Sequence, residues 1–327
     1  MSCNIGGQKA SLYIILEKEE RLRMIPDWNP ERWKDLPENP LVSPVGRVIG
    51  DPQILTPGEY DDFWHMYVWG DRPRGGGCIY HYDSRDGINW RLIETITSFS
   101  KSCGLVYLYK EEGTWYMLYT KYMSYTIICV RESKDLINWS EETTLIVPDL
   151  SWELEGPKSQ VRNPCLIKVD NTYRLYYSGG TIWLDDCGYE EPKYISFAES
   201  INITGPYKKY GEPILTPNPK IVYRNFGAGA IKVFKWEDKF LGFYNGIYKD
   251  QEGRSRSAIS IAVSNDGINW EDAPFNPIIS PTEGWKKALV YQLDVVFDYQ
   301  GKTIIYYNAR DGWREGIERI GASVLTS

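Results

Sequence analysis

Short segments in which apolar and polar residues alternate follow one another along most of this chain, separated by turn residues. Four of them are rich in aromatic residues: FWHMYVW (63–69), TWYMLYT (114–120), TYRLYYS (172–178) and KFLGFYN (239–245). A further apolar segment precedes each one, and another follows it: CIYHY (78–82), TIICV (126–130), YISFA (194–198) and AISIAV (258–263). Alternation over so few residues, with a turn between neighbours, predicts antiparallel β-meanders.

These segments belong to a unit that recurs five times. Three copies end on similar turns, DSRDGINW at Trp90, ESKDLINW at Trp139 and SNDGINW at Trp270, and AESINITGPY at Tyr207 is a degenerate fourth. The C-terminal LDVVFDY, TIIYYNARD and ERIGASVL form a fifth copy. The first strands are marked by Asp51, Gly104, Asn163, Gly229 and Asp294, at spacings of 53, 59, 66 and 65 residues. Such spacings hold about four strands with loops, and radial repetition of four-stranded units is typical of a β-propeller.

The sequence therefore predicts an all-β protein, a single five-bladed β-propeller domain over residues 1–327 with four-stranded antiparallel blades. The expected blades cover residues 46–100, 101–150, 160–217, 224–281 and 288–327. The last copy ends at SVLTS without a fourth strand, whereas SLYIILEK at 11–18 has strand character and no unit of its own. We expect residues 11–18 to complete the fifth blade and close the ring.

Polar side chains from all five copies are expected on one face of the ring. Because a meander reverses at every strand, the starts of first strands and the ends of second strands lie together where the central channel opens, and a ligand site is expected there. Basic residues hold matching positions on this face, namely Arg47, Lys101, Arg162, Arg224 and Arg310. They either bind an anionic or highly hydroxylated ligand or form ion pairs with Asp51, Asp294, Asp311 or Glu318. The DGINW turns fall on the opposite face and are interpreted as structural.

Composition argues against several other classes of protein. A net charge of -7 and a pI near 5.2 argue against a general nucleic-acid binder, which shows a basic balance or a basic stripe. The N-terminus lacks an apolar signal segment, and no run approaches the roughly 18 apolar residues of a membrane span, so we expect a cytoplasmic protein without membrane or nucleic-acid partners. The six cysteines and two histidines form no zinc motif. The cysteines in or beside apolar runs are expected to be buried thiols: Cys78, Cys103, Cys129 and Cys165.

The chain resembles the five-bladed propeller glycosidase superfamily, namely glycoside hydrolase families 43 and 32 and the family 130 phosphorylases, as a divergent member. The resemblance rests on the fivefold repeat and on three local motifs, GDP (50–52), VRNP (161–164) and YYNARDGW (306–313). It implies a carbohydrate-active protein whose site is the mouth of the channel. In families 43 and 32 a first-blade Asp is base or nucleophile, an Asp in an RDP-like motif orients or tunes, and a Glu of the following blade is general acid.

Asp51 matches the first of these roles, but the other two positions depart from the pattern. Asn163 stands in place of the second Asp, and FGAGAIKVF (226–234) has no Glu at the place of the acid. Either Asp294 of the fifth blade supplies the missing carboxylate, or phosphate is a co-substrate held by the basic residues, as the resemblance to the phosphorylases implies. A third interpretation is a noncatalytic carbohydrate-binding propeller with three stacking surfaces: Trp69, Trp183 and Trp313.

The preferred interpretation is an enzyme that cleaves or transfers a glycosidic bond of an oligosaccharide or glycoside, with Asp51 and Asp294 as the catalytic residues. The residues expected to bind the substrate, including any anionic group on it, are Arg47, Trp69, Lys101, Arg162, Asn163, Trp183, Arg224, Arg310 and Asp311. Glu155, in a long loop before the third blade, is a further acid that could reach the site. The scheme requires no metal or other cofactor, although the resemblance allows a calcium ion in the channel.

Overall fold

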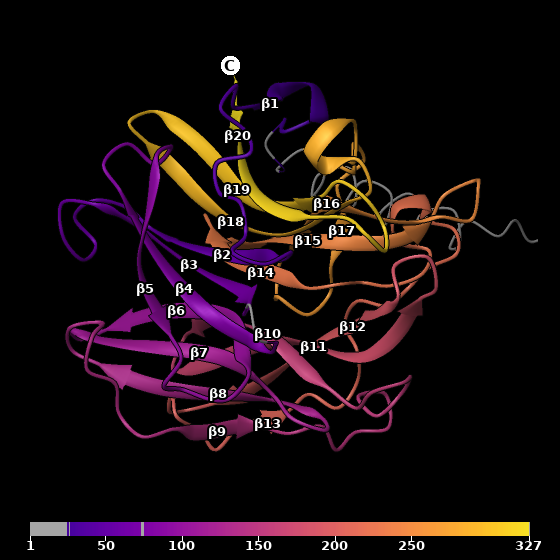
Figure 1. The fold of residues 1–327 in the computed structure, drawn as a ribbon. Coiled ribbons are helices and arrows are strands. Elements are labelled where there is room, and N and C mark those ends of the chain that lie inside the picture. The colour runs from indigo at the N-terminus through magenta and orange to yellow at the C-terminus, as the bar shows by residue number, and fades with distance from the viewer. Residues whose placement is uncertain (1–24, 26, 73–74, 327) are drawn as a thin grey trace, which may run out of the picture.

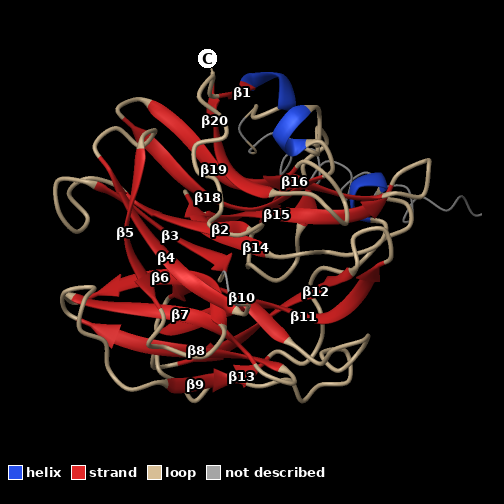
Figure 2. Cartoon of the chain, in the orientation of Figure 1, coloured by secondary structure: helices blue, strands red, loops and turns tan. Residues whose placement is uncertain are grey.

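The computed structural model describes residues 25, 27–72 and 75–326. They form five four-stranded antiparallel sheets around a central channel, which confirms the predicted five-bladed β-propeller (Figure 1). Nearly all regular structure in these ranges is strand, since the described helices are three single 3-10 turns (Figure 2). None of these helices is long and apolar enough to cross a membrane. The turns are η1 (Pro30–Arg32), η2 (Val222–Arg224) and η3 (Gly284–Lys286).

The first four blades are meanders whose strands pair in chain order. The first blade contains β2 (Ile49–Leu55), β3 (Trp64–Asp71), β4 (Gly77–Ser84) and β5 (Trp90–Ile96). The second contains β6 (Cys103–Glu111), β7 (Thr114–Tyr122), β8 (Thr126–Ser133) and β9 (Thr143–Ile146). The third contains β10 (Val161–Val169), β11 (Thr172–Leu184), β12 (Tyr189–Ser200) and β13 (Lys208–Lys209). The fourth contains β14 (Ile231–Trp236), β15 (Lys239–Lys249), β16 (Ser255–Ser264) and β17 (Glu271–Asp272).

A strand from the N-terminal part of the chain closes the fifth blade. This blade holds β18 (Leu289–Tyr299), β19 (Lys302–Arg310) and β20 (Glu318–Leu325), and β1 (Trp33–Asp35) pairs antiparallel with β20 (Figure 1). The predicted closure by an N-terminal strand is correct, but the strand is β1. The segment 11–18, to which we assigned it, lies outside the described residues. Sequence reasoning missed β1 because three residues, WKD, are too few to show an alternating pattern.

The hydrophobic core is a ring of five layers, one between each pair of neighbouring blades. The layer between the fourth and fifth blades also takes in Trp28 and Trp33 of the closing segment, whose rings meet edge to face with centroids 6.3 Å apart. Because both faces of every sheet are covered by neighbouring sheets, middle strands such as β4 and β16 are buried at nearly every position. The predicted buried thiols are confirmed within these layers: Cys78, Cys103, Cys129 and Cys165.

The DGINW turns are structural, as predicted. Asp86 Oδ1 accepts hydrogen bonds from the backbone N–H groups of Ile88 at 2.9 Å and Asn89 at 2.8 Å, and Asn89 Nδ2 donates to Asp86 Oδ2 at 2.8 Å. Asp135 and Asp266 make the same set of bonds in the second and fourth blades. An Asp side chain that accepts hydrogen bonds from the backbone two and three residues later fixes a tight turn. These repeats are therefore the turns that connect the third and fourth strands.

A β-bulge interrupts the pairing of the first and second strands near the channel mouth. It falls at the same place in four blades, between Gly50 and Gln53, Gly104 and Tyr107, Arg162 and Cys165, and Val290 and Leu293. This register makes Tyr291 the fifth-blade equivalent of Asp51. Asp294, which the sequence repeat had aligned with Asp51, lies three residues further along β18. The repeat alignment was wrong at this position because a β-bulge shifts the strand pairing but does not change the pattern of apolar residues.

We expect Trp33→Ala to lower the free energy of unfolding by about 3–5 kcal/mol, because the change removes a buried aromatic side chain from the layer that holds the closing strand. Lys34→Ala, on the exposed side of the same strand, is the matched control and should change stability by no more than about 0.5 kcal/mol. Urea denaturation followed by circular dichroism measures both. Equal losses in the two variants would contradict this role for Trp33.

Candidate active site at the channel mouth

A cavity of about 330 Å³ opens at the mouth of the channel, and all five blades contribute to its wall. Its lining combines four acids, two arginines, four side-chain amides and several aromatic rings. The polar residues of the lining are Asp51, Arg162, Asn163, Glu190, Glu191, Asn245, Gln292, Asn308, Arg310 and Glu318, and the aromatic residues are Trp69, Tyr122, Tyr189 and Tyr291. Glu190 is a fourth acid on the wall, next to Glu191. A concave site with convergent polar groups and aromatic walls is the usual form of a small-ligand site.

Asp51 stands at the bulge of β2 and lies between two amide side chains. Its backbone N–H donates to Asn308 Oδ1 at 3.1 Å, and its carboxylate Oδ1 accepts a hydrogen bond from Asn163 Nδ2 at 3.0 Å. Burial raises the pKa of Asp51 to about 6, against the opposing effects of the Arg162 and Lys232 charges and of the Asn163 hydrogen bond. The sequence therefore correctly places Asp51 in the cavity.

Glu318 reaches the cavity from the start of β20 and lies close to the backbone beside Asp51. Its Oε1 accepts a hydrogen bond from Asn308 Nδ2 at 2.5 Å, and its Oε2 is 3.9 Å from Arg310 Nη1. Burial raises the pKa of Glu318 to about 8, although the Arg310 charge opposes the shift. A Cβ on Gly50 would stand 2.6 Å from Asn308 Nδ2 and 2.7 Å from Glu318 Oε1. The glycine of the GDP motif is therefore needed for the close approach of this pair.

Glu191 is the acid that sequence reasoning missed. It lies on β12, near the end of the long β11–β12 hairpin, and forms an ion pair with Arg162 at 2.9 Å. Burial raises the pKa of Glu191 to about 7, with Arg162 opposing and the negative charge of Asp51 reinforcing the shift. The segment YEEPKY, which contains Glu191, belongs to no repeated motif. The only signal was the position of this acidic pair next to a second-strand end on the mouth face.

Five of the predicted site residues line the cavity: Asp51, Trp69, Arg162, Asn163 and Arg310. Asp294 does not. It lies deeper in the channel, where its Oδ2 accepts hydrogen bonds from Gln53 Nε2 and from the backbone N–H of Ile54, both at 2.8 Å. Burial raises the pKa of Asp294 to about 6. The structure thus gives Asp294 protein partners and separates it from the cavity wall.

The other predicted substrate-binding residues are dispersed. Arg224 is buried in the fourth blade, where it pairs with Asp272 at 2.8 Å, and Asp311 pairs with Arg319 at 2.7 Å. The side chain of Arg47 lies at the rim and donates to the backbone oxygen of Arg314 at 3.0 Å. Two more are exposed and outside the lining: Lys101 and Trp183. The predicted cluster of five cations is therefore reduced to the two arginines of the cavity, because equivalent positions in the repeat differ in register and in side-chain direction.

Glu155 and Trp313 also serve the surrounding structure. Glu155 accepts a hydrogen bond from Tyr194 and pairs with Lys193. Trp313 Nε1 donates to the backbone oxygen of Ser255 at 2.8 Å. Neither side chain lines the cavity.

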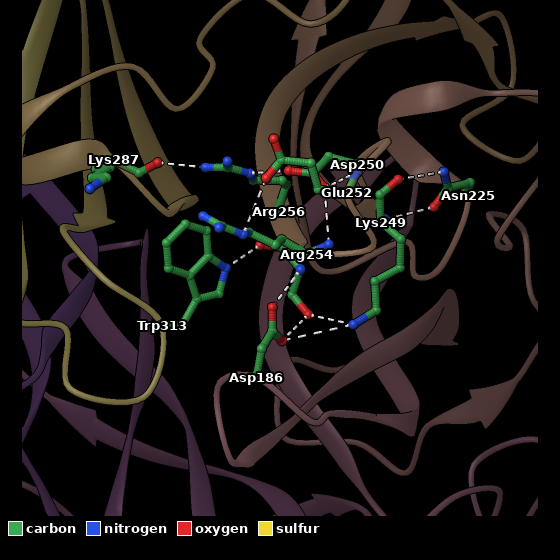
Figure 3. A network of polar contacts seen from close by, with 10 residues as sticks. Asp186, Asn225, Lys249, Asp250, Glu252, Arg254, Arg256, Lys287 and Trp313 are labelled. Atoms are coloured by element: carbon green, nitrogen blue, oxygen red, sulfur yellow. Dashed lines mark hydrogen bonds and ion pairs between the residues drawn. The ribbon is translucent and has the colours of Figure 1, made fainter.

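A polar network braces the wall that carries Glu191 (Figure 3). Asp186, at the tip of the β11–β12 hairpin, accepts hydrogen bonds from the backbone N–H of Ser255 at 2.7 Å and from its hydroxyl at 2.5 Å. Ser255 is also the residue that Trp313 bonds from the β19–β20 loop. Loops of the third, fourth and fifth blades are thereby tied together around the mouth. The network fixes the hairpin from which Glu191 enters the cavity.

The channel does not fit the calcium ion that the resemblance allows. Calcium takes six to eight oxygen ligands, and the Asp294 carboxylate is already used by Gln53 and backbone amides. The ammonium of Lys232 also lies in this part of the channel and repels a second cation. Among the residues that the structure describes, no group of three or more His, Cys, Asp and Glu side chains is placed to hold a metal ion.

Comparisons with known proteins agree with the fold and with the resemblance drawn from the sequence. Residues 106–222 match the family described as Glycosyl hydrolases family 43. A glycosyl hydrolase from Bacteroides ovatus is 13% identical, with a TM-score of 0.67 over 91% of this chain and 95% of that chain. The catalytic domain of the Coprinopsis cinerea GH62 alpha-L-arabinofuranosidase is 12% identical, with a TM-score of 0.67 over 90% and 97% of the two chains. A comparison with curated protein sequences finds no match.

The same fold also carries a different reaction. An N-acetylgalactosamine deacetylase from F. plautii, in complex with blood group B trisaccharide, is 15% identical, with a TM-score of 0.60 over 89% of this chain and 93% of that chain. The chain therefore shares the five-bladed propeller of glycoside hydrolases, and the comparisons support a carbohydrate-active enzyme. The reaction itself has to be argued from the carboxyl groups of the cavity.

The raised pKa of Glu318 predicts a pH dependence of stability. The group titrates near 4.5 when unfolded and at about 8 when folded, so its contribution is complete below pH 4.5 and is lost as the pH rises through 8. We expect the stability of Glu318→Gln, relative to wild type, to be about 3–4 kcal/mol more favourable at pH 8 than at pH 5. Urea denaturation at both pH values measures the difference. Parallel curves for Glu318→Gln and wild type would contradict the prediction.

Proposed function

We propose that the protein is a glycoside hydrolase that removes a terminal sugar residue from a glycan or glycoside. The observation that carries the proposal is the convergence of Asp51, Glu191 and Glu318, from three different blades, in one cavity at the start of the inner strands. Hydrolysis of a glycosidic bond uses two carboxyl groups, one protonated and one ionised. The fold shared with glycoside hydrolases supports the same conclusion.

Asp51 is the base in this proposal. Its pKa of about 6 leaves the carboxylate ionised at neutral pH, because two positive charges and the Asn163 hydrogen bond oppose the effect of burial. Asn163 donates to Oδ1, and we assign the other oxygen to the attacking water. Asn163 and Asn308 fix the carboxylate and the backbone of Asp51 from either side.

Glu191 is the general acid. With a pKa of about 7, a large share of its carboxyl groups carries a proton at neutral pH, as an acid that protonates a leaving oxygen requires. Its side chain is 14% exposed and comes from the β11–β12 hairpin, so it is partly open to the solvent. The Arg162 ion pair orients the carboxyl group and restores the charge balance once the proton has left.

The cavity favours a small, hydroxylated terminal residue. Its volume of about 330 Å³ is near the lower end of the roughly 300–1,000 Å³ range of ligand sites, so it suits the end of a chain. Side-chain amides of Asn245 and Gln292 offer donors and acceptors to sugar hydroxyls, and Trp69 offers an apolar ring face.

Hydrolysis is favoured over phosphorolysis by the placement of the cations. Only Arg162 and Arg310, of the five basic residues expected to hold phosphate, line the cavity, and each faces a glutamate. A screen of aryl glycosides, hexuronides and oligosaccharides, each with and without inorganic phosphate, tests the choice. Release of free sugar independent of phosphate supports the proposal. Phosphate-dependent release of a sugar 1-phosphate would replace it with a phosphorylase, and binding without turnover would replace it with a binding protein.

On the best substrate, we expect Asp51→Asn to lower kcat by about 10²–10⁴-fold with any leaving group, because the base is lost. Glu191→Gln should lose a similar factor on an oligosaccharide or alkyl glycoside, but much less on a dinitrophenyl glycoside, whose leaving group departs without a proton. Steady-state kinetics with paired leaving groups measure this contrast.

Glu190→Gln is the matched control, because Glu190 precedes Glu191 and also lines the cavity. It should keep activity on both kinds of leaving group. The assignment of Glu191 as the acid is wrong if Glu191→Gln loses the same factor on both leaving groups, or if Glu190→Gln reproduces its effect.

A further inference from the structure

A lysine lies buried in the channel beneath the candidate active site. Lys232, on β14, is only 3% exposed. Its ammonium donates to Gln53 Oε1 at 3.3 Å and lies 4.5 Å from the centre of the Tyr107 ring. Among the described residues, no carboxylate oxygen comes within the 4.0 Å of an ion pair. Burial of an ammonium without a close counter-ion is costly, so a benefit elsewhere in the channel has to offset the cost.

Lys232 lies close enough to Asp51 to share the wall of one cavity with it. A small cavity of about 10 Å³ is lined by both residues together with Asn163 and Gln292, which also line the main cavity. This volume is about that of a single water-sized probe. The Lys232 charge therefore acts on the Asp51 carboxylate from the wall of this small cavity.

The two arginines of the cavity are already committed to other acids. Arg162 pairs with Glu191 at 2.9 Å, and Arg310 lies 3.9 Å from Glu318. Lys232 is shared between Asp51 and Asp294, because its charge opposes the effect of burial on both carboxyl groups.

Asp294, however, is also held by hydrogen bonds from Gln53 and from the backbone of Ile54 and Val295. Its negative charge is stabilised by donors that do not titrate. Among the described residues, Asn163 alone donates a side-chain hydrogen bond to the Asp51 carboxylate, which therefore depends more on nearby cations.

We propose that Lys232 is a positioning residue that serves as the resident cation of the channel and keeps Asp51 ionised as the base. The proposal takes the role of Asp51 from the proposed function. The charged and titratable groups that face Asp51 are Arg162, Lys232, Glu191, Glu318 and Tyr122. Those that face Lys232 are Asp51, Asp294, Cys165 and Tyr107. The fixed positive charge of this ammonium stabilises the nearby carboxylates as a metal ion in the channel would, which agrees with the poor fit for calcium.

The test is the titration of Asp51 in the full-length protein. Carboxyl ¹³C NMR of aspartate-labelled protein follows the group directly, with Asp51→Asn to assign its signal. In Lys232→Met we expect the midpoint of Asp51 to rise by about one pH unit or more, because the opposing charge is gone. Lys232→Arg keeps the charge and should restore a midpoint close to that of wild type. The acid limb of kcat/KM on the best substrate should move by the same amount as the NMR midpoint.

A buried charge left unpaired at Asp294 could unfold Lys232→Met. The double variant Lys232→Met/Asp294→Asn removes both charges. Compared with Asp294→Asn alone, it should show the same upward shift of the Asp51 midpoint. An unchanged Asp51 midpoint in a folded lysine variant overturns the proposal. The NMR titration of Asp51 needs no substrate, so it tests the effect of Lys232 even on a protein without glycosidase activity. Absence of that activity would overturn the proposed function alone.

Discussion

The left-handed backbone at the start of the inner strands is the constraint on which the site depends. Asp51, Leu105, Asn163 and Gly229 have φ of 53°, 52°, 55° and 65°. A non-glycine residue in this conformation costs roughly 1–2 kcal/mol, and Asp and Asn tolerate it better than most because their side chains bond locally. In the first three blades a bulge takes this residue out of the ladder, and the residue lines the cavity at the channel mouth. The first and third blades use this geometry to bring Asp51 and Asn163 within hydrogen-bonding distance across the mouth.

Around this contact the cavity charges fall into two arms. One arm runs from Asp51 through Asn163 to the neighbouring Arg162 and on to Glu191, and the other runs through Asn308 to Glu318. An amide side chain stands next to Asp51 in each arm, so the carboxyl groups are held near one another without direct contact between like charges. Burial then raises the pKa of all three acids, and their midpoints separate to about 6, 7 and 8. Acids that share a site and titrate apart are what acid–base catalysis requires.

The fold could be predicted from the sequence because each blade repeats the same order of strands and turns. The closing strand could not be identified, because Trp33–Asp35 is held by packing and by pairing with β20, neither of which shows in three residues. Asp51 and Asn163 were found because their blades keep the GDP and RNP motifs. Asp294 was misaligned by a bulge, and Glu191 lies on a hairpin extension that the other blades do not repeat. The fivefold repeat thus predicts the propeller fold, whereas the site depends on positions at which single blades depart from the repeat.

Those departures also explain where the acids come from. The resemblance implies an acid in the blade of Gly229, but a Cβ there would stand 2.0 Å from the backbone oxygen of Asn245, and Asn163 already uses the third-blade position to hold Asp51. No side chain fits at Gly229, so a carboxyl group has to enter the same cavity from another strand. Glu191 and Glu318 both do so from third strands of their blades, on walls that the mouth-facing loops support. The reaction requires a carboxyl group at a certain position in the cavity, and a side chain from more than one strand of the propeller can reach that position.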